Sequence, residues 1–449
     1  MDYFEMNNYI QILLKYGTGR GMLELAEIIK REDERQIRNV ELIASENYPS
    51  PAVRAAMACS FTSKYAEGYP GKRYYGGCGP TDVLETYCQQ RWQKVFDCED
   101  TYDVNVQPHS GTQANMAAIM ATCNPGDTIL SMSLNAGGHL SHGSKVSFSG
   151  KLYNVIEYGL DTEGYIDLYD FEQQLRKYSD KIKLVIIGAS AYSRQIPYIK
   201  MCNLVKEHSP EGFNIPVMVD IAHVSGLIST KRLESPFGCA DIITMTSQKL
   251  ARGPRGGIIF TKPEWTKKVN STLFPGIQGG PLENMIAAKA VCANEMLTGE
   301  YEEYICNVQN NAAKMADRFI QLGYHVITNG TDNHMFLVDV YSTTGLTGKE
   351  VQDLLDSEGI TLNKNMIPND TLPPSQCSGI RIGTPAMTTR NWCSSTFVDI
   401  ADTIDKIIKR EMAEKKSFKE DNESNKIGVP FIGYPLLCLH YFLKMYLTD

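Results

Sequence analysis

The chain has 449 residues, of which 43% are hydrophobic and 21% charged, and its formal net charge is −8. This length and composition describe a globular protein with more than one structural unit and exclude a disordered or fibrous chain. The acidic balance disfavours a nucleic-acid partner, because phosphates favour basic surfaces. The 12 cysteines include no C-x-x-C pair, which favours reduced thiols over a zinc site or a disulfide framework.

The two ends of the chain bear on its location. Residues 1–6 lack the basic start of a signal peptide and the arginine-rich character of a transit peptide. The longest apolar stretch, 427–447, is broken by Pro430, Pro435 and Lys444 and is too interrupted to span a bilayer. We therefore expect a cytoplasmic protein with no membrane segment.

The chain divides into four parts. Residues 1–40 form an amphipathic arm, which is either a solvated helix face or a segment that embraces a partner subunit. From 41 to 300, short apolar runs alternate with helical patterns, as at 128–130, 184–187, 217–219 and 257–260. This alternation predicts an α/β domain with a mainly parallel sheet that is buried on both faces. Residues 301–414 read as a smaller α+β domain, and 415–449 as a charged linker followed by an atypical apolar tail.

Three polar residues fall at the ends of predicted strands. Asp220 ends the apolar run 217–219, Lys249 follows the run 242–248, and Ser190 follows 184–187. In parallel sheets ligands bind at the carboxyl ends of the strands. A lysine at one strand end and an aspartate at another suit pyridoxal phosphate (PLP): the lysine forms a Schiff base, and the aspartate keeps the pyridinium nitrogen protonated. The alternative is a surface lysine that merely follows a core strand.

Three further segments bear on chemistry. Residues 108–115 place Ser110, Gly111 and Thr112 before a helical run, where they act either as an ordinary N-cap or as a phosphate site. Residues 137–142 carry two histidines. The other ligands of a metal site are missing nearby, so we expect no metal and favour an imidazole stacked on a cofactor ring. Residues 65–75 form a turn-rich loop with four tyrosines, one acid and two bases, and such loops often carry function.

Together these segments resemble the serine hydroxymethyltransferases, PLP enzymes of the aspartate-aminotransferase fold (fold type I). The resemblance runs roughly from Leu23 to Met412. Besides the segments above, it rests on residues 41–47, 274–281, 329–334 and 378–385. It implies a large domain with a mainly parallel seven-stranded sheet and a smaller α+β C-terminal domain.

The resemblance also implies a role for each site residue. Lys249 would hold PLP, and Glu67, His223 and Tyr75 would complete the catalytic group, with Glu67 as the acid–base group near the serine hydroxyl. The remaining cofactor contacts would be Ser110, Gly111, Thr112, His139, Ser190, Asp220, Tyr65, Gly279 and Gly280. The substrate contacts would be Ser45 and Arg381 for the amino-acid carboxylate, and Tyr74, Leu140 and Asn365 for tetrahydrofolate.

The implied reaction interconverts serine and tetrahydrofolate with glycine and 5,10-methylenetetrahydrofolate. Because Tyr65, Glu67, Gly279 and Gly280 would come from a neighbouring subunit, we expect a homodimer or homotetramer with shared sites. Two other readings stay open: a folate-independent PLP aldolase, and a catalytically weak paralogue that serves as a scaffold.

The segment around the reactive lysine departs from the family pattern. Gln248 stands where the family usually has histidine, and Leu250 where it has a hydroxyl residue. The amide of Gln248 still donates and accepts hydrogen bonds. We expect slower turnover and relatively more side reaction, such as transamination and retro-aldol cleavage.

Overall fold

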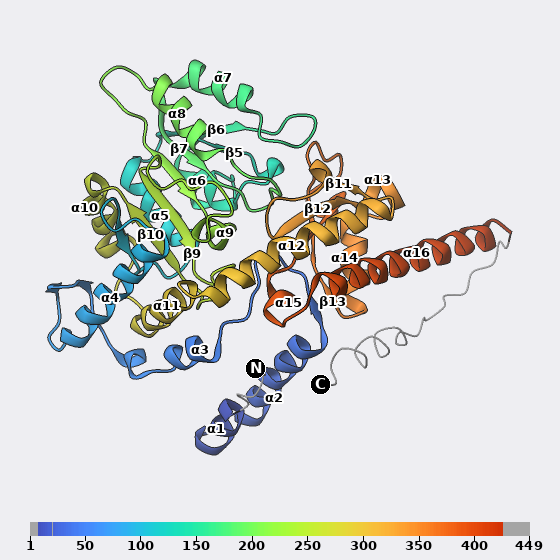
Figure 1. Ribbon diagram of the computed structural model, residues 1–449, viewed down its shortest axis with the longest axis horizontal. Helices are drawn as coiled ribbons and strands as arrows, with labels where there is room; N and C mark the ends of the chain where they lie inside the picture. The colour runs from blue at the N-terminus through green and yellow to red at the C-terminus, as the bar shows by residue number, and fades with distance from the viewer. Residues whose placement is uncertain (1–7, 20, 425–449) are drawn as a thin grey trace.

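The structure is a computed structural model that describes residues 8–19 and 21–424. Figure 1 shows a large domain and a small domain, with one long helix running between them. The large domain is built on a seven-stranded sheet. All neighbouring strands are parallel except that β10 runs antiparallel to β4 and β9. In spatial order the strands are β4 (Asp103–Asn105), β10 (Gly257–Thr261), β9 (Ile242–Thr246), β8 (Val217–Asp220), β7 (Ile182–Ile187), β5 (Thr128–Met132) and β6 (Asn154–Tyr158).

Both faces of this sheet are buried, as the continuous apolar runs predict. Along β7, Val185 and Ile187 pack into one hydrophobic core, while Leu184 and Ile186 pack into another on the opposite face. The helices of this domain are α3 (Pro51–Met57), α4 (Gly79–Val95), α5 (Gly111–Thr122), α6 (Phe148–Leu152), α7 (Leu168–Tyr178), α8 (Tyr198–His208), α9 (Ser225–Ser229), α10 (Pro263–Ser271) and α11 (Glu283–Met296).

The small domain has its own four-stranded antiparallel sheet and a separate hydrophobic core. Its strands in spatial order are β11 (His325–Val326), β12 (Met335–Asp339), β15 (Gly379–Gly383) and β14 (Asn363–Asn365). Its helices are α12 (Gly299–Gln321), α13 (Val340–Thr344), α14 (Gly348–Ser357), α15 (Pro385–Thr389) and α16 (Ser394–Ser424).

The domain limits differ in two places from those expected from the sequence. Strand β1 (Val40–Glu41) pairs with β13 (Ile360–Thr361), and Leu42 packs into the small-domain core. The chain therefore crosses the small domain before it enters the large one. Helix α16 continues to residue 424, through most of the segment expected as a linker. The apolar tail expected at 427–449 lies outside the described residues.

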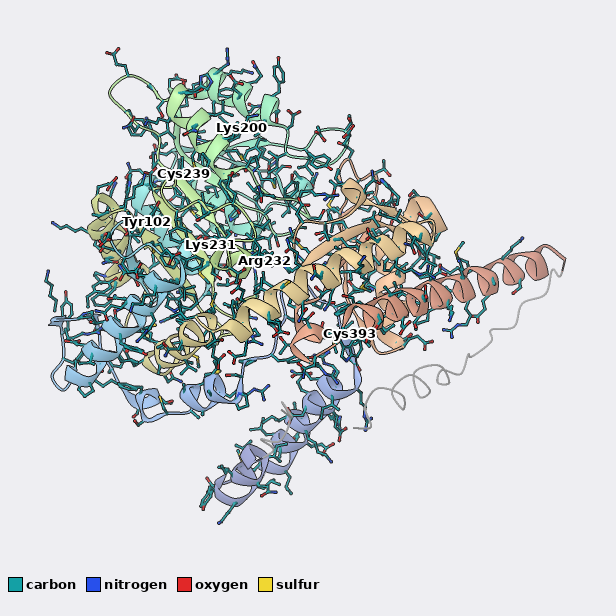
Figure 2. All side chains as sticks on the ribbon, viewed as in Figure 1. Tyr102, Lys200, Lys231, Arg232, Cys239 and Cys393 are labelled. Carbon is teal, nitrogen blue, oxygen red and sulfur yellow. The ribbon has the colours of Figure 1, made fainter. Side chains whose placement is uncertain are left out.

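Helix α12 connects the two domains. Near its middle, Gln309 accepts a hydrogen bond at 2.6 Å from Arg232, which Figure 2 labels close to this helix. Helices α1 (Asn8–Tyr16) and α2 (Met22–Arg38) form an arm that projects from the body of the molecule (Figure 1). The arm exposes large apolar side chains, including Leu23 and Ile28. Among the described residues, no helix combines the length and apolar character needed to cross a bilayer.

Candidate active site

A cavity of about 300 Å³ lies at the carboxyl ends of the parallel strands. Asp220 is the last residue of β8, and Lys249 follows the end of β9 by three residues, so both reach this edge of the sheet as predicted. The cavity wall contains ten of the predicted cofactor-binding, catalytic and substrate-binding residues: Ser45, Ser110, Gly111, Thr112, His139, Ser190, Asp220, His223, Lys249 and Arg381.

Lys249 is suited to act as a nucleophile. Burial lowers the pKa of its ammonium group to about 8; the charge of Asp220 raises this pKa, and that of Arg381 lowers it further. Among the described residues, no hydrogen-bond or ion-pair partner holds its Nζ. A substantial fraction of the amine is therefore neutral near physiological pH and free to react with a carbonyl carbon.

Asp220 is held as a carboxylate by three donors. Asn115 donates to it at 2.8 Å, His142 Nε2 lies at 3.0 Å, and the Ala222 amide donates at 2.9 Å. Burial raises the pKa of Asp220, but the hydrogen bond from His142 and nearby positive charges outweigh burial and hold the pKa below its usual range. The Asp220 side chain is therefore ionised at neutral pH and can pair with a cationic ring nitrogen.

Sequence reasoning missed the roles of Asn115 and His142. Both residues stand in segments that drew attention, but their role is set by contact between α5, the loop 137–142 and β8. Thr244 donates to the Asn115 carbonyl oxygen at 2.6 Å. This bond orients the amide so that its NH₂ group faces Asp220.

His139 presents a neutral imidazole to the cavity. Burial, followed by the neighbouring charge of His142, lowers the pKa of His139 to about 4. Its Nδ1 accepts from the Ser141 amide at 3.2 Å and lies 2.7 Å from the Ser141 hydroxyl. Because Nδ1 is the acceptor, the ring proton resides on Nε2. A neutral, fixed ring is suited to stacking on an aromatic cofactor.

The start of α5 is shaped to receive an anion. Ser110 is the N-cap of this helix, and its hydroxyl accepts from the Gln113 amide. Gly111 and Thr112 line the cavity. They belong to the first turn of the helix, where the amides have no partner within the helix and the dipole is positive. A side chain at Gly257 would place its Cβ 2.4 Å from the Ser110 carbonyl oxygen, so β10 packs closely against the turn before α5.

Arg381 brings a buried positive charge into the cavity wall. Its guanidinium donates to the Ser190 carbonyl at 2.7 Å and to Asn363 at 3.1 Å. Burial lowers its pKa to about 10, so it stays charged at neutral pH. No carboxylate in the described part of the chain pairs with it. An unpaired buried guanidinium is a ready site for the carboxylate of a small ligand.

His223 belongs to a pair of buried imidazoles. Its Nδ1 lies 3.2 Å from Nε2 of His334, and its Nε2 lies 3.5 Å from the Ser190 hydroxyl. Burial, followed by the charges of Lys249 and Arg381, lowers the pKa of His223 well below its ordinary range. His223 is therefore neutral and offers a hydrogen-bonding nitrogen beside the cavity.

The other predicted site residues lie outside the cavity wall. Tyr65, Glu67 and Tyr75 cluster with Gly279 and Gly280: the tyrosine rings meet edge to face at 5.3 Å, and the Tyr65 hydroxyl lies 3.5 Å from Glu67. This cluster is exposed, with 58% of Tyr65 accessible. Tyr74 contacts Phe274 nearby, Leu140 is 48% exposed, and Asn365 lies in β14.

Comparison with known families identifies the chain. A family model described as serine hydroxymethyltransferase matches residues 21–404, which is most of the chain. The chain belongs to the serine hydroxymethyltransferase family. It is therefore a PLP-dependent enzyme of fold type I, and its α/β architecture with a mainly parallel seven-stranded sheet agrees with that assignment.

The residues of the cavity fit PLP. A lysine with a free amine, a carboxylate at a strand end, a flat neutral imidazole and an anion-binding helix start all surround one space. These are the groups that the aldehyde, ring nitrogen, ring face and phosphate of PLP require.

The two departures from the family pattern fall in different surroundings. Gln248 lines the cavity, and its side-chain oxygen accepts from the Gly256 amide at 3.3 Å. Leu250 is fully buried in the large-domain core, near Gly226 and Tyr301. Only the glutamine is in a position to act on bound cofactor, whereas Leu250 affects packing.

Proposed function

We propose that this protein is a serine hydroxymethyltransferase that transfers the hydroxymethyl carbon of serine to tetrahydrofolate, giving glycine and 5,10-methylenetetrahydrofolate. The observation that carries the proposal is the cavity in which Lys249, Asp220, His139 and Arg381 converge at the start of α5. PLP bound there supplies an electron sink for the bond broken at the substrate Cα. The direction of the reaction depends on the concentrations of the four reactants.

The chain's own groups would bind and orient this cofactor. Lys249 would attach it covalently, Asp220 would hold the ring-nitrogen proton, and His139 would stack on the ring. Ser110, Gly111 and Thr112 would bind the phosphate. Ser190 and His223 would lie beside the phenolic oxygen of the cofactor and the carbon that is attached to Lys249. There the neutral imidazole of His223 would orient the cofactor ring without adding charge.

Arg381 would grip the carboxylate of serine or glycine as a two-pronged donor, with Ser45 assisting. Both residues line the cavity. Tyr74, Leu140 and Asn365 would contact the pterin or aminobenzoyl part of tetrahydrofolate. These three residues lie outside the cavity wall of one chain, so a folate site would be completed only in an assembly.

We also propose that the active form is a homodimer or homotetramer. An exposed cluster lies outside the cavity that contains Lys249 of the same chain; it consists of Tyr65, Glu67, Tyr75, Gly279 and Gly280. This arrangement is required if the cluster serves the active site of a neighbouring chain. Glu67 would then exchange a proton with the serine hydroxyl across the interface. The cysteines in the described part of the chain are all free, which supports a cytoplasmic location.

The visible spectrum of purified protein tests the proposal. We expect PLP to give an absorption band that is lost in Lys249→Ala, and glycine to add a long-wavelength band that strengthens strongly with tetrahydrofolate. A glycine response indifferent to folate would favour a folate-independent aldolase. Protein that binds no PLP would favour a scaffold.

A further inference from the structure

A buried polar network outside the cavity connects the loop 65–75 to the segment that leads into α5. At its centre is Glu85 of α4, whose side chain is fully buried. On one side Arg73 donates to Glu85 at 2.7 Å, and on the other Gln107 donates to it at 2.9 Å. No step of the proposed reaction uses these three residues.

Arg73 fixes the loop. One of its guanidinium nitrogens donates to the carbonyls of Ala66 and Gly68, which flank Glu67, at 2.9 Å each. Its Nε donates to Asp82 at 2.8 Å. The loop that carries Glu67 is therefore held to α4 in two ways: Arg73 bonds to Asp82 and Glu85, and the Gly71 amide donates to Asp82 at 2.9 Å. Glu85 and Asp82 together fix the orientation of the guanidinium group.

Gln107 connects the same carboxylate to the cofactor side. It lies three residues before Ser110, the N-cap of α5, and its side chain also donates to the Gly68 carbonyl at 2.9 Å. The backbone carbonyl of Gln107 accepts a hydrogen bond from the side-chain amide of Gln278, whose side-chain oxygen accepts one from the His109 backbone amide. The segment before the phosphate-binding turn is thus bonded directly to the loop.

We propose that Glu85 is a positioning residue for two active sites at once. It would hold Ser110 in place for the cofactor of its own chain and Glu67 in place for the site of the neighbouring chain. The inference rests on the proposed function, because it assumes that Glu67 acts across a subunit interface. Removing the carboxylate breaks contacts to a guanidinium and an amide, and each lost contact of this kind changes affinity or rate by about tenfold.

Hybrid oligomers separate the two effects. In the first hybrid, a Glu85→Gln chain is paired with a Lys249→Ala chain, so the remaining lysine lies in the Glu85→Gln chain and receives an unaltered loop. In the second, a wild-type chain is paired with a Glu85→Gln, Lys249→Ala chain, so the remaining lysine receives the altered loop. The control pairs wild type with Lys249→Ala.

We expect the first hybrid to bind PLP about tenfold more weakly than the control, measured by the visible band of the intact Lys249. We expect the second to lose about tenfold in kcat and to show an altered pH profile. The inference is overturned if either hybrid matches the control. A control hybrid with neither PLP band nor turnover would instead refute the proposed function.

Two further variants guard against simple misfolding. Asp82→Asn disturbs Arg73 but not Gln107, and should therefore affect the second hybrid alone. Gln107→Leu leaves the Arg73–Glu85 pair in place and should weaken PLP binding in the first hybrid. Equal effects of both variants on both hybrids would show a general loss of structure and would overturn the positioning role.

Discussion

The charge balance around Lys249 predicts the pH at which the protein captures its cofactor. The pKa of Lys249 is about 8, compared with an ordinary value of 10.5. At pH 7.5 this shift raises the neutral, reactive fraction of the amine from about 0.001 to about 0.24, roughly two hundredfold. The rate of PLP capture by the cofactor-free protein should therefore rise about tenfold per pH unit below pH 8 and level off above it.

Arg381 provides the perturbation, because its positive charge contributes to the lowered pKa of Lys249. In Arg381→Gln that charge is lost, and the midpoint of the pH profile should move upward. Arg381→Lys keeps the charge and should leave the midpoint near that of wild type. The ionisations of PLP itself are common to all three proteins and cancel in the comparison.

Stopped-flow absorbance at the visible band measures this rate at each pH. A wild-type midpoint near 10 would refute the lowered pKa. Equal midpoints in Arg381→Gln and Arg381→Lys would refute the electrostatic explanation.

Three other substitutions test separate parts of the account. Gln248→His should raise turnover and reduce the share of transamination and retro-aldol products, and an unchanged rate and product ratio would rule out a role for Gln248. Gly257→Ala should weaken PLP binding more than tenfold in a cofactor titration, because the new Cβ would lie 2.4 Å from the Ser110 carbonyl oxygen. The control is Gly159→Ala, whose Cβ would have no atom within 4 Å, and this variant should bind PLP normally. Burial, followed by the charge of the neighbouring Glu85, raises the pKa of Glu283 from 4.5 to about 8. The protonated Glu283 therefore contributes fully to the stability of the folded protein below pH 4.5, and this contribution is lost as the pH rises to about 8. Glu283→Gln should therefore raise the Tm increasingly from pH 5 to pH 9, and an equal gain at both pH values would contradict this.

Much of the cavity could be predicted because strand ends are visible in the sequence. Asp220 and Lys249 directly follow apolar runs, and parallel strands bring such ends to one edge of a sheet. Ser190 follows β7 in the same way and lines the cavity.

Residues whose role depends on contacts between distant elements were harder to find. His142 bonds to Asp220, 78 residues away, and no spacing rule predicts that contact. The pairing of β1 with the small domain was not predicted for a similar reason. Strand β1 is only two residues long and pairs with β13, more than 300 residues further along the chain. Pairing so remote leaves no local pattern in the sequence.

Transfer of an isotopic label from serine tests the central claim most directly. The protein is incubated with PLP, tetrahydrofolate and serine labelled at the Cβ carbon, and the products are followed by NMR. The account predicts that the label appears in 5,10-methylenetetrahydrofolate together with equimolar glycine, and that Lys249→Ala abolishes both. Glycine formed at the same rate without tetrahydrofolate, or no glycine at all from PLP-loaded protein, would contradict it.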